Sequence, residues 1–477
     1  MIASESELFS VLRQYNPWWG GGIPADLPGW RRAAFGDFLT WVTEPPAHRA
    51  ILLSGARQVG KTTLMLQSIT ELLRQGVKRE QILYATFDHP LLKLAGLEEV
   101  LRVWHDMQGP REGPQYLMLD EIQSVKDWGV WLKHQVDFHK NARIAVTGSA
   151  IPITVEDRES GAGRWHTIKL PTLSFLEYVQ IKGAALPQLP PIRSLAEVAD
   201  WPGKDRIRAG EEARTLVAHF HEYLLRGGFP QTALVDDITT AQRLVREDIL
   251  DKVIKRDMTA FFGVRRVLEL EKLFLYLCLH DGGILDLRTL CSNLELTKPT
   301  VSNFLDLLEA AHLVRRLRPY GYGKEVLRGR YKIYLSDPAI AGSVLLKGKD
   351  LLGDRIRLGA AVETAVVRHI LGYYDRGSVG FSYWRGKRDL EVDVVAEIQG
   401  QIIPFEVKFQ EGRVDLESLK GLRAFCREKA LSLGYVITRD MSDFEVIADS
   451  QGSQARGECR FLKIPAPLAC LWLSGSQ

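Results

Sequence analysis

The segment Gly-Ala-Arg-Gln-Val-Gly-Lys-Thr at positions 55–62 has the composition of a phosphate-binding loop. It fits the pattern G-x-x-x-x-G-K-[ST], a loop whose successive backbone N–H groups can surround a chain of phosphates. Lys61 would reach the β- and γ-phosphates of a nucleotide, and the hydroxyl of Thr62 would bind Mg²⁺. The predicted nucleotide-binding residues are Gly55, Ala56, Arg57, Gln58, Val59, Gly60, Lys61, Thr62 and Thr63.

The residues on either side of this loop support the same interpretation. Residues 50–54 form a short apolar run, which is typical of a buried parallel strand. Residues 63–73 carry apolar side chains at helical spacing. A strand, a glycine loop and a helix in this order place the N-terminus of the helix against phosphate. The segment therefore predicts a nucleotide site.

A second apolar run ends in two carboxylates, Asp120 and Glu121. Asp120 would hold Mg²⁺ through its water shell, and Glu121 would polarise the water that attacks the γ-phosphate. The alternative is a strand that merely ends in surface acids. The next predicted strand is followed by Thr147 and Ser149, and either side chain is a candidate sensor of the γ-phosphate. ATP hydrolysis with Mg²⁺ is the predicted activity.

Composition limits the class of protein. A length of 477 residues suggests roughly three domains. The net charge of +3 is small, so any affinity for nucleic acid must come from local patches. The five cysteines include no C-x-x-C pair, which argues against structural zinc and a disulfide framework. With no signal peptide and no apolar run of membrane-spanning length, a cytoplasmic location is expected, with no membrane partner.

The pattern of apolar runs predicts an α/β protein made of several parts. Strands expected at 49–54, 81–87, 116–119 and 143–147 alternate with helices, which indicates a doubly wound parallel sheet. The predicted segments are an aromatic N-terminal segment at 1–30, a P-loop ATPase core at 31–180, a linker and helical lid at 181–262, a winged helix at 263–340 and a nuclease-like α/β domain at 350–477.

The predicted winged helix could contact DNA. Helical patterns occur at 265–279, 285–294 and 298–311, and the third resembles a DNA recognition helix with small polar residues on one face. A basic stretch at 312–332 would form the wing. The alternative is a winged helix used only for oligomerisation. The candidate residues for contact with duplex or branched DNA are Lys298, Thr300, Asn303, Arg328 and Arg330.

A further group of polar residues lies in the C-terminal part. Glu363 lies on an apolar helix, Asp393 on an apolar strand, and Glu406 and Lys408 on the next strand. Alternation along that strand puts Glu406 and Lys408 on the same side, where the carboxylates could share a divalent metal and Lys408 could act on a water molecule. The spacing resembles the catalytic core of restriction-endonuclease-like nucleases. Retained cleavage and an inactive fold both remain open.

Together these parts resemble one family, the prokaryotic ATP-binding proteins with an AAA-type ATPase domain followed by a DUF4143 region. The motifs that carry the resemblance are G-x-R-Q-V-G-K-T at 55–62, D-E-x-Q at 120–123, T-G-S at 147–149, G-R at 163–164, P-T-L-S-F-L-E at 171–177 with an extra Thr172, G-G-F-P at 227–230, R-D at 256–257 and K-x-Y-x-x-D at 332–337.

The resemblance implies an AAA layout, and with it a homo-oligomer that we expect to be a hexameric ring. In that layout Arg164 would reach the γ-phosphate of a neighbouring subunit, and Arg226 is a weaker candidate. The alternative for Arg164 is a local ion pair with an acid.

Two functions are consistent with these features. The first is an ATP-hydrolysing AAA-type motor acting on DNA, whose C-terminal module binds and could cut DNA. The second is an ATP-dependent conformational switch that docks a protein partner in a defence or toxin system, with the nuclease-like fold as an inactive scaffold. DNA-stimulated ATPase activity would distinguish them, because a switch should ignore DNA.

Overall fold

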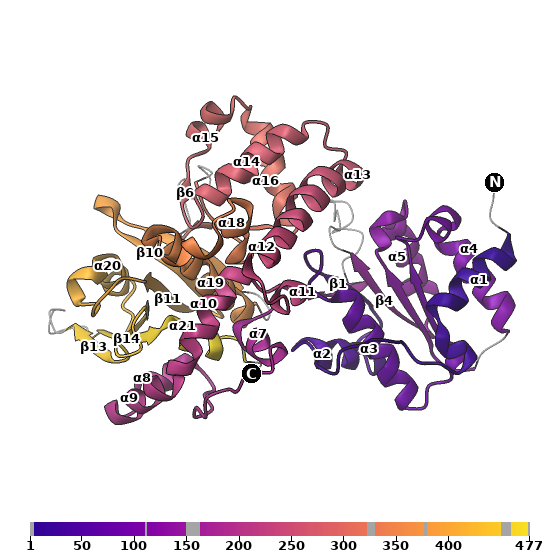
Figure 1. Cartoon of the computed structure of the whole chain (residues 1–477), viewed down its shortest axis with the longest axis horizontal. Helices are drawn as coiled ribbons and strands as arrows, with labels where there is room; N and C mark the ends of the chain where they lie inside the picture. Colours follow the sequence, from indigo (N-terminus) through magenta and orange to yellow (C-terminus); the bar gives the residue numbers. More distant parts are fainter. Residues whose placement is uncertain are drawn as a thin grey trace. The chain divides into compact units, whose positions relative to one another are not determined.

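The computed structural model describes residues 4–109, 112–148, 163–321, 330–375, 379–449 and 459–475. The chain divides into two compact units, drawn in Figure 1. The first comprises Met1–Pro171 with Asp257–Val264, and the second comprises Thr172–Arg256 with Arg265–Gln477. The five segments expected from the sequence are thus grouped into two units, and the N-terminal segment belongs to the first unit.

The first unit is built on a five-stranded sheet in the order β2-β3-β4-β1-β5. Every neighbouring pair is parallel, which confirms the doubly wound α/β fold. The fifth strand, β5, was not expected from the sequence. Because β4 lies between β1 and β3, the ends of these three strands meet at one edge of the sheet. The strands are β1 Ala50–Ser54, β2 Ile82–Thr86, β3 Gln115–Asp120, β4 Ala142–Gly148 and β5 Trp165–Lys169.

Helices cover this sheet, and the N-terminal segment is fastened to it. The Asn16 side-chain amide donates to Tyr84 O at 2.8 Å and accepts from Tyr84 N at 2.7 Å. The indole N–H groups of Trp18 and Trp19 both donate to Ile82 O. The tryptophan pair therefore anchors the segment to β2. The helices of this unit include α1 Glu5–Tyr15, α2 Phe35–Thr43, α3 Lys61–Arg74, α4 Pro90–Gln108, α5 Trp128–Phe138 and α13 Met258–Phe262.

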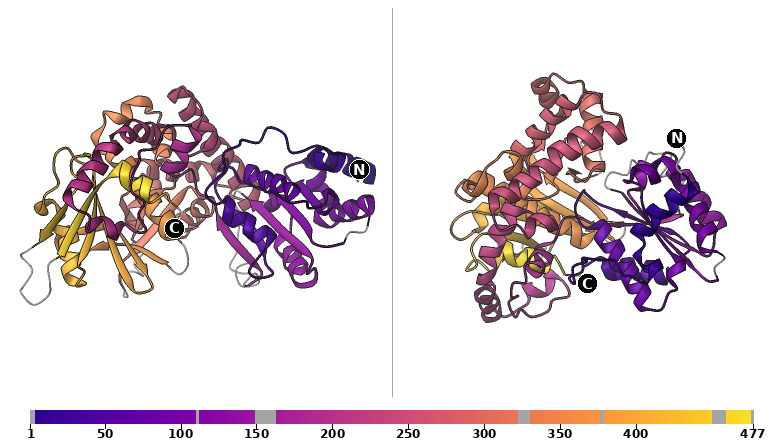
Figure 2. Two further views of the ribbon diagram at one scale, coloured as in Figure 1. Left: turned by 90° about the horizontal axis from the view of Figure 1, so that it is seen from below. Right: turned by 45° about the vertical axis from the view of Figure 1, so that its right-hand side comes forward.

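The second unit contains a nine-stranded mixed sheet in the order β13-β14-β12-β11-β10-β9-β7-β8-β6. Figure 2 shows its orange and yellow strands side by side. The strands are β6 Ile284–Leu285, β7 Val314–Pro319, β8 Tyr331–Leu335, β9 Val379–Arg385, β10 Glu391–Ile398, β11 Gln401–Lys408, β12 Leu433–Thr438, β13 Val446–Asp449 and β14 Cys459–Pro465.

The expected winged helix lies in this unit and is continuous with the C-terminal sheet. Its elements follow in the order α14 (Val267–Leu279), β6, α15 (Leu287–Leu294), α16 (Lys298–Ala310), β7 and β8. Strand β7 pairs with β8 antiparallel and with β9 parallel. The segments predicted to be a winged helix and a nuclease-like domain thus share one hydrogen-bonded sheet, whereas the sequence predicted two separate domains.

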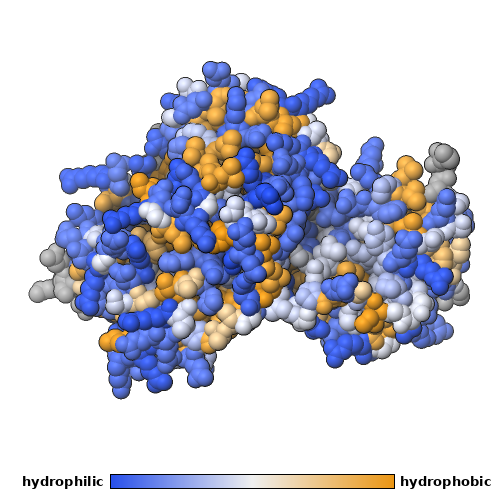
Figure 3. Space-filling view, viewed as in Figure 1, coloured by the Kyte–Doolittle hydropathy of each residue, from blue (hydrophilic) through white to orange (hydrophobic). Residues whose placement is uncertain are grey.

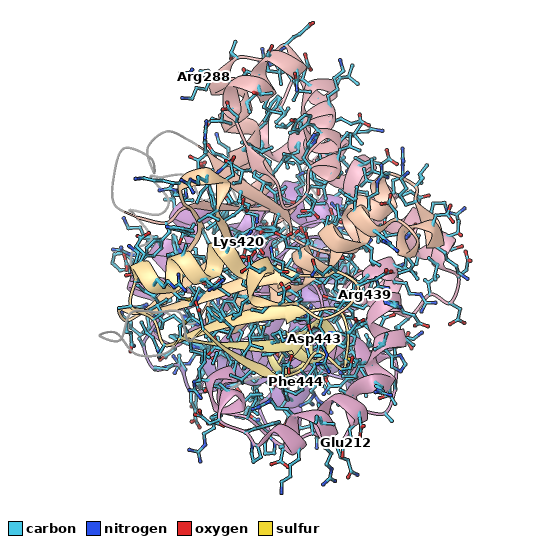
Figure 4. The ribbon with its side chains drawn as sticks, turned by 90° about the vertical axis from the view of Figure 1, so that its left-hand side faces the viewer. Glu212, Arg288, Lys420, Arg439, Asp443 and Phe444 are labelled. Carbon is cyan, nitrogen blue, oxygen red and sulfur yellow. The ribbon has the colours of Figure 1, made fainter. Side chains whose placement is uncertain are left out.

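The segment expected to be a linker and lid is mostly helical. It contains α8 Leu195–Ala199, α9 Gly203–Glu212, α10 Leu216–Arg226, α11 Pro230–Ala233, α12 Ile238–Arg246 and the π-helix η5 Glu247–Asp257. Other helices of this unit are α7 Phe175–Ile181, α18 Ala339–Val344, α19 Arg355–Tyr374, α20 Lys420–Glu428 and α21 Ala466–Trp472. Figure 4 shows Lys420, the first residue of α20, together with Arg288 on α15.

The G-G-F-P and K-x-Y-x-x-D motifs meet in this unit. Asp337 is fully buried and accepts hydrogen bonds from Gly228 N at 2.8 Å and Ala339 N at 3.0 Å. Gly227 has a φ of 75°, and a Cβ added there would lie 2.4 Å from Asp337 Oδ1. Because a side chain cannot fit, the turn requires glycine. These two motifs therefore serve the fold.

The face of the molecule drawn in Figure 3 is largely polar. In the view of Figure 3, hydrophilic residues cover most of the molecule, and apolar residues interrupt them in small groups. No helix within the described ranges combines the length and apolar character needed to cross a membrane.

Candidate functional site

The predicted phosphate loop joins β1 to α3, as the sequence indicated. Gly60 precedes the helix with a φ of 94°, and Gln58 also has a positive φ of 60°. A Cβ added at Gly55 would lie 2.2 Å from Leu170 O, so the chain that follows β5 leaves room only for glycine there. The shape of the loop therefore depends on glycine at positions 55 and 60, for two different reasons. Gly55 allows close packing, and Gly60 turns the backbone into the helix.

Lys61 is the first residue of α3 and is buried, with 5% of its surface exposed. Its Nζ donates to Gly55 O at 2.9 Å and Ala56 O at 2.8 Å. Among the residues that the structure describes, it makes no ion pair. Burial lowers the pKa of Lys61 to about 8, although the carboxylates of Glu121 and Asp120 act to raise it. A buried ammonium that has only carbonyl partners fits an anionic ligand such as a phosphate chain.

Asp120 brings three strands together. Its Oδ2 accepts hydrogen bonds from Thr62 Oγ1 at 2.8 Å and from Tyr84 OH at 3.0 Å. Its Oδ1 accepts a short hydrogen bond from Thr147 Oγ1. The Thr62 hydroxyl and the Asp120 carboxylate are adjacent oxygen donors of the kind that Mg²⁺ prefers, and would hold the metal beside the phosphates. The sequence predicted Thr62 and Asp120, but nothing in it indicated Tyr84.

Glu121 follows β3 with a φ of 53°, in the left-handed region. Its backbone N–H donates to Thr147 Oγ1 at 3.2 Å, and its carboxylate accepts from Gln123 Nε2 at 2.5 Å. Burial raises the pKa of Glu121, while the nearby Lys61 ammonium opposes the rise. A raised pKa suits a group that accepts a proton during hydrolysis. Thr147 is thus linked to both acids, whereas the other sensor candidate, Ser149, lies outside the described residues.

Arg57, in the middle of the loop, has a partner that was not identified from the sequence. Its Nη1 lies 2.7 Å from Asp257 Oδ2 and 2.9 Å from Asp257 Oδ1. The Asp257 side chain is only 3% exposed. Asp257 ends η5, where the chain returns to the first unit. The R-D motif at 256–257 marks Asp257 as a family residue, but the sequence does not show that it contacts Arg57.

Arg164 directly precedes β5, and its backbone O accepts from Ala50 N at the start of β1. It therefore lies at the end of the sheet opposite to the phosphate loop of its own subunit, which follows the other end of β1. Its Nε lies 3.0 Å from Asp137 Oδ1, and its side chain is 31% exposed. The local ion pair considered from the sequence is thus present. Arg226 is 6% exposed and bonds to Glu222 and to the backbone O of Asp236.

The predicted nuclease-like residues converge in the second unit. Asp393 on β10 accepts from Val407 N on β11 at 2.8 Å. Lys408 Nζ lies 2.6 Å from Glu406 Oε1, so these two side chains share a face as expected. A residue without a predicted role, Lys332 on β8, lies among the acids. Its Nζ is 2.6 Å from Asp393 Oδ1, 2.7 Å from Glu391 Oε1 and 3.1 Å from Glu363 Oε1.

The DNA-binding candidates differ in their surroundings. Lys298 and Asn303 on α16 are exposed, while Thr300 is half-buried and its hydroxyl contacts Thr297. Arg330 is exposed and lies 3.6 Å from Asp286. Arg316 of the basic stretch contacts Glu309 and Asp306 on α16. Part of the positive charge expected on the wing is therefore paired internally. Arg328 lies outside the described residues.

Three parts of the chain match known families. Residues 47–179 match a family described as an AAA domain, and residues 358–453 match a domain of unknown function, DUF4143. Residues 217–351 match another domain of unknown function, DUF8612. These matches confirm the resemblance drawn from the motifs.

Relatives of similar length occur in bacteria and archaea. The chain is 24% identical over 410 residues to an uncharacterised protein of Haemophilus influenzae, covering 83% of this chain and 92% of the relative. It is 24% identical over 361 residues to an uncharacterised protein of Methanocaldococcus jannaschii, covering 74% of each.

Among solved structures, the chain is similar to Cdc6p from Pyrobaculum aerophilum, with 14% identity, a TM-score of 0.26 and coverage of 68% of this chain and 97% of that one. It is also similar to the replication initiator DnaA bound to AMPPCP and single-stranded DNA, with 14% identity, a TM-score of 0.26 and coverage of 60% and 90%. The AAA family match, not these low TM-scores, supports an AAA-type ATPase core.

Proposed function

The chain combines an AAA domain with a C-terminal DUF4143 region, and from this premise we propose that it hydrolyses ATP with Mg²⁺. The observation that carries the proposal is the set of contacts around Asp120. This carboxylate bonds to Thr62 of the phosphate loop and to Thr147 at the end of the neighbouring strand. Groups needed for metal binding, phosphate binding and sensing thus meet at one sheet edge.

Each residue has a distinct task in this proposal. The Lys61 ammonium would turn from the carbonyls of its own loop to the β- and γ-phosphates. Asp120 and Thr62 would hold Mg²⁺, which supplies charge neutralisation for the phosphates. Glu121 would orient a water molecule and accept its proton. Thr147, whose hydroxyl donates to the Asp120 carboxylate and accepts from the Glu121 backbone N–H, would hold these two residues in place.

ATP hydrolysis by the purified full chain tests this proposal. Lys61→Ala should abolish turnover, because the site loses its only buried ammonium within the described part of the phosphate loop. Lys93→Ala is the matched control, since Lys93 is exposed on α4 of the same unit. Turnover in Lys61→Ala equal to that of the control would refute the assignment of the site.

DNA binding is a second candidate function, and the exposed face of α16 favours it. Lys298 and Asn303 lie on that face, and Arg288 projects from the neighbouring α15 in Figure 4. A helix that follows a short helix and turn can enter the major groove. If the chain is a DNA motor, duplex or branched DNA should stimulate its ATPase activity. A switch that docks a protein partner should show no stimulation.

The α16 proposal has its own variant test. Lys298→Glu should weaken DNA binding and reduce its dependence on salt, because a phosphate contact is lost. Lys204→Glu, at an exposed lysine on α9, is the control for net charge. Equal DNA affinity in the two variants would remove α16 from the interface. DNA cleavage is disfavoured, because Lys332 lies among the acids that would have to bind the metal.

A further inference from the structure

A lysine lies at the centre of the carboxylate cluster in the second unit. Lys332 is 2% exposed, and its Nζ lies within 3.1 Å of oxygens from Glu363, Glu391 and Asp393. A lysine ammonium has three N–H donors and no acceptor. The three carboxylates, from α19 and β10, are as many as the N–H donors of the ammonium, so each donor can have one carboxylate as its acceptor.

The rest of the cluster is arranged around this ammonium. Tyr334, two residues along the same strand, donates its hydroxyl to Glu363 Oε1 at 2.7 Å. Asp393 uses its second oxygen to accept from Val407 N. Although burial acts to lower the pKa of Lys332, the carboxylate of Asp393 and its neighbours hold that pKa well above its ordinary value. The ammonium therefore stays charged inside the unit.

A divalent metal does not fit this arrangement. The acids that would bind it, Glu363 and Asp393, already surround the Lys332 ammonium. A metal ligated by the same oxygens would lie next to the positive charge of Lys332, which is almost completely buried. Glu406 offers a metal at most one oxygen, because Oε1 is paired with Lys408 and only Oε2 is buried without a hydrogen-bond partner among the described residues. No group of three or more His, Cys, Asp or Glu residues in the described ranges is placed to hold a metal ion.

We propose that Lys332 is the resident cation of this cluster and occupies the place of a divalent metal. The cluster then has a structural role, because its ion pairs connect strand β8 of the predicted winged helix to β10 and α19. It is not a hydrolytic centre. Strands β7 and β9 lie between β8 and β10 in the sheet order, so this contact spans two intervening strands. This role explains Lys332 and Tyr334 of the K-x-Y-x-x-D motif. The third residue, Asp337, accepts the backbone hydrogen bonds of the G-G-F-P turn and of α18.

Manganese binding to nucleotide-free protein tests the proposal. Free Mn²⁺ is counted by electron paramagnetic resonance in the wild type, Lys332→Met, Asp393→Asn and the double variant. Wild type and Asp393→Asn should bind the same amount. Lys332→Met should gain one site that the double variant loses, and Mn²⁺ should raise its melting temperature by a few degrees. Any background binding at the phosphate loop is common to all four proteins.

Two results would overturn the proposal. One is a Mn²⁺ site in the wild type that Asp393→Asn removes, and the other is a folded Lys332→Met protein that gains no site. If Lys332→Met does not fold, cleavage of the wild-type backbone by Fe²⁺ and peroxide decides. Cuts mapped by mass spectrometry within 391–408 would show that a metal binds despite Lys332, and their absence alongside cuts at the phosphate loop would support the lysine as the resident cation.

Discussion

Raising the pH from about 7 to about 9 should weaken ATP binding, because Lys61 loses its proton in the free protein over this range. Burial lowers the pKa of Lys61 to about 8 when its partners are the carbonyls of Gly55 and Ala56. The phosphates of ATP should raise that pKa again, since an opposite charge favours the charged form. Only the protonated lysine binds phosphate well, so affinity falls as the pH passes the pKa of the free protein.

The size of the effect follows from that pKa. With a pKa of about 8, about nine-tenths of the Lys61 side chains are charged at pH 7 and about one-tenth at pH 9. If the bound lysine keeps its proton throughout, the Kd for ATP should rise about tenfold, which corresponds to about 1.4 kcal/mol. A lysine with an ordinary pKa near 10.4 would leave the Kd almost unchanged over the same range.

Fluorescence titration with a labelled ATP analogue at fixed ionic strength would measure this dependence. Lys61→Arg is the matched control, because a guanidinium stays charged throughout and its affinity should not vary with pH. A Kd that does not change between the two pH values in the wild type would refute the assigned pKa. The same rise in Lys61→Arg would show that another group titrates.

Three further predictions concern the same unit. Glu121→Gln should bind ATP but lower turnover by at least about 10²-fold, as seen by comparing binding with phosphate release, because the amide cannot accept a proton. Asp257→Asn should destabilise the ATPase unit by about 1.5–3 kcal/mol in chemical denaturation, since Arg57 loses a charge-assisted hydrogen bond; an unchanged unfolding midpoint would contradict this. If Arg164 acts on a neighbouring subunit, Arg164→Ala should lower turnover without weakening ATP binding, and mixing it with Glu121→Gln subunits should restore part of the activity. Equal losses of melting temperature and turnover in Arg164→Ala and Asp137→Asn, with no recovery on mixing, would instead indicate the local ion pair.

The parts of the site that are contiguous in the chain could be predicted from the sequence. The phosphate loop needs glycine, lysine and threonine at fixed spacing, because its backbone must curl and its helix must begin at Lys61. The apolar run before Asp120 likewise marks a buried strand with an acid at its end. The start of α16, with Thr297 as its N-cap and Pro299 in its first turn, could also be predicted, because capping depends on residues within one turn.

The sequence could not show which strands would become neighbours. The contact of Asp120 with Tyr84 and Thr147 depends on β3 lying between β2 and β4, which is a property of the sheet. Strand β5 was missed because it lies at the sheet edge and its residues are only partly buried, so its apolar alternation is weak. Arg57 gave no local sign of Asp257, which is 200 residues away.

The lysine among the C-terminal acids is visible only in the folded chain. Acids on α19, β10 and β11 suggested a metal site from their types and spacing, and the fold does bring them together. Lys332 argues against the predicted metal site, because its ammonium bonds to Asp393. It lies on β8, 61 residues before Asp393 in the chain, so nothing in the sequence indicated this contact. The alternation of side chains along a strand can be read from the sequence and gives the face on which each residue lies. The cation that neutralises a buried carboxylate is known only once segments distant in the chain have packed together.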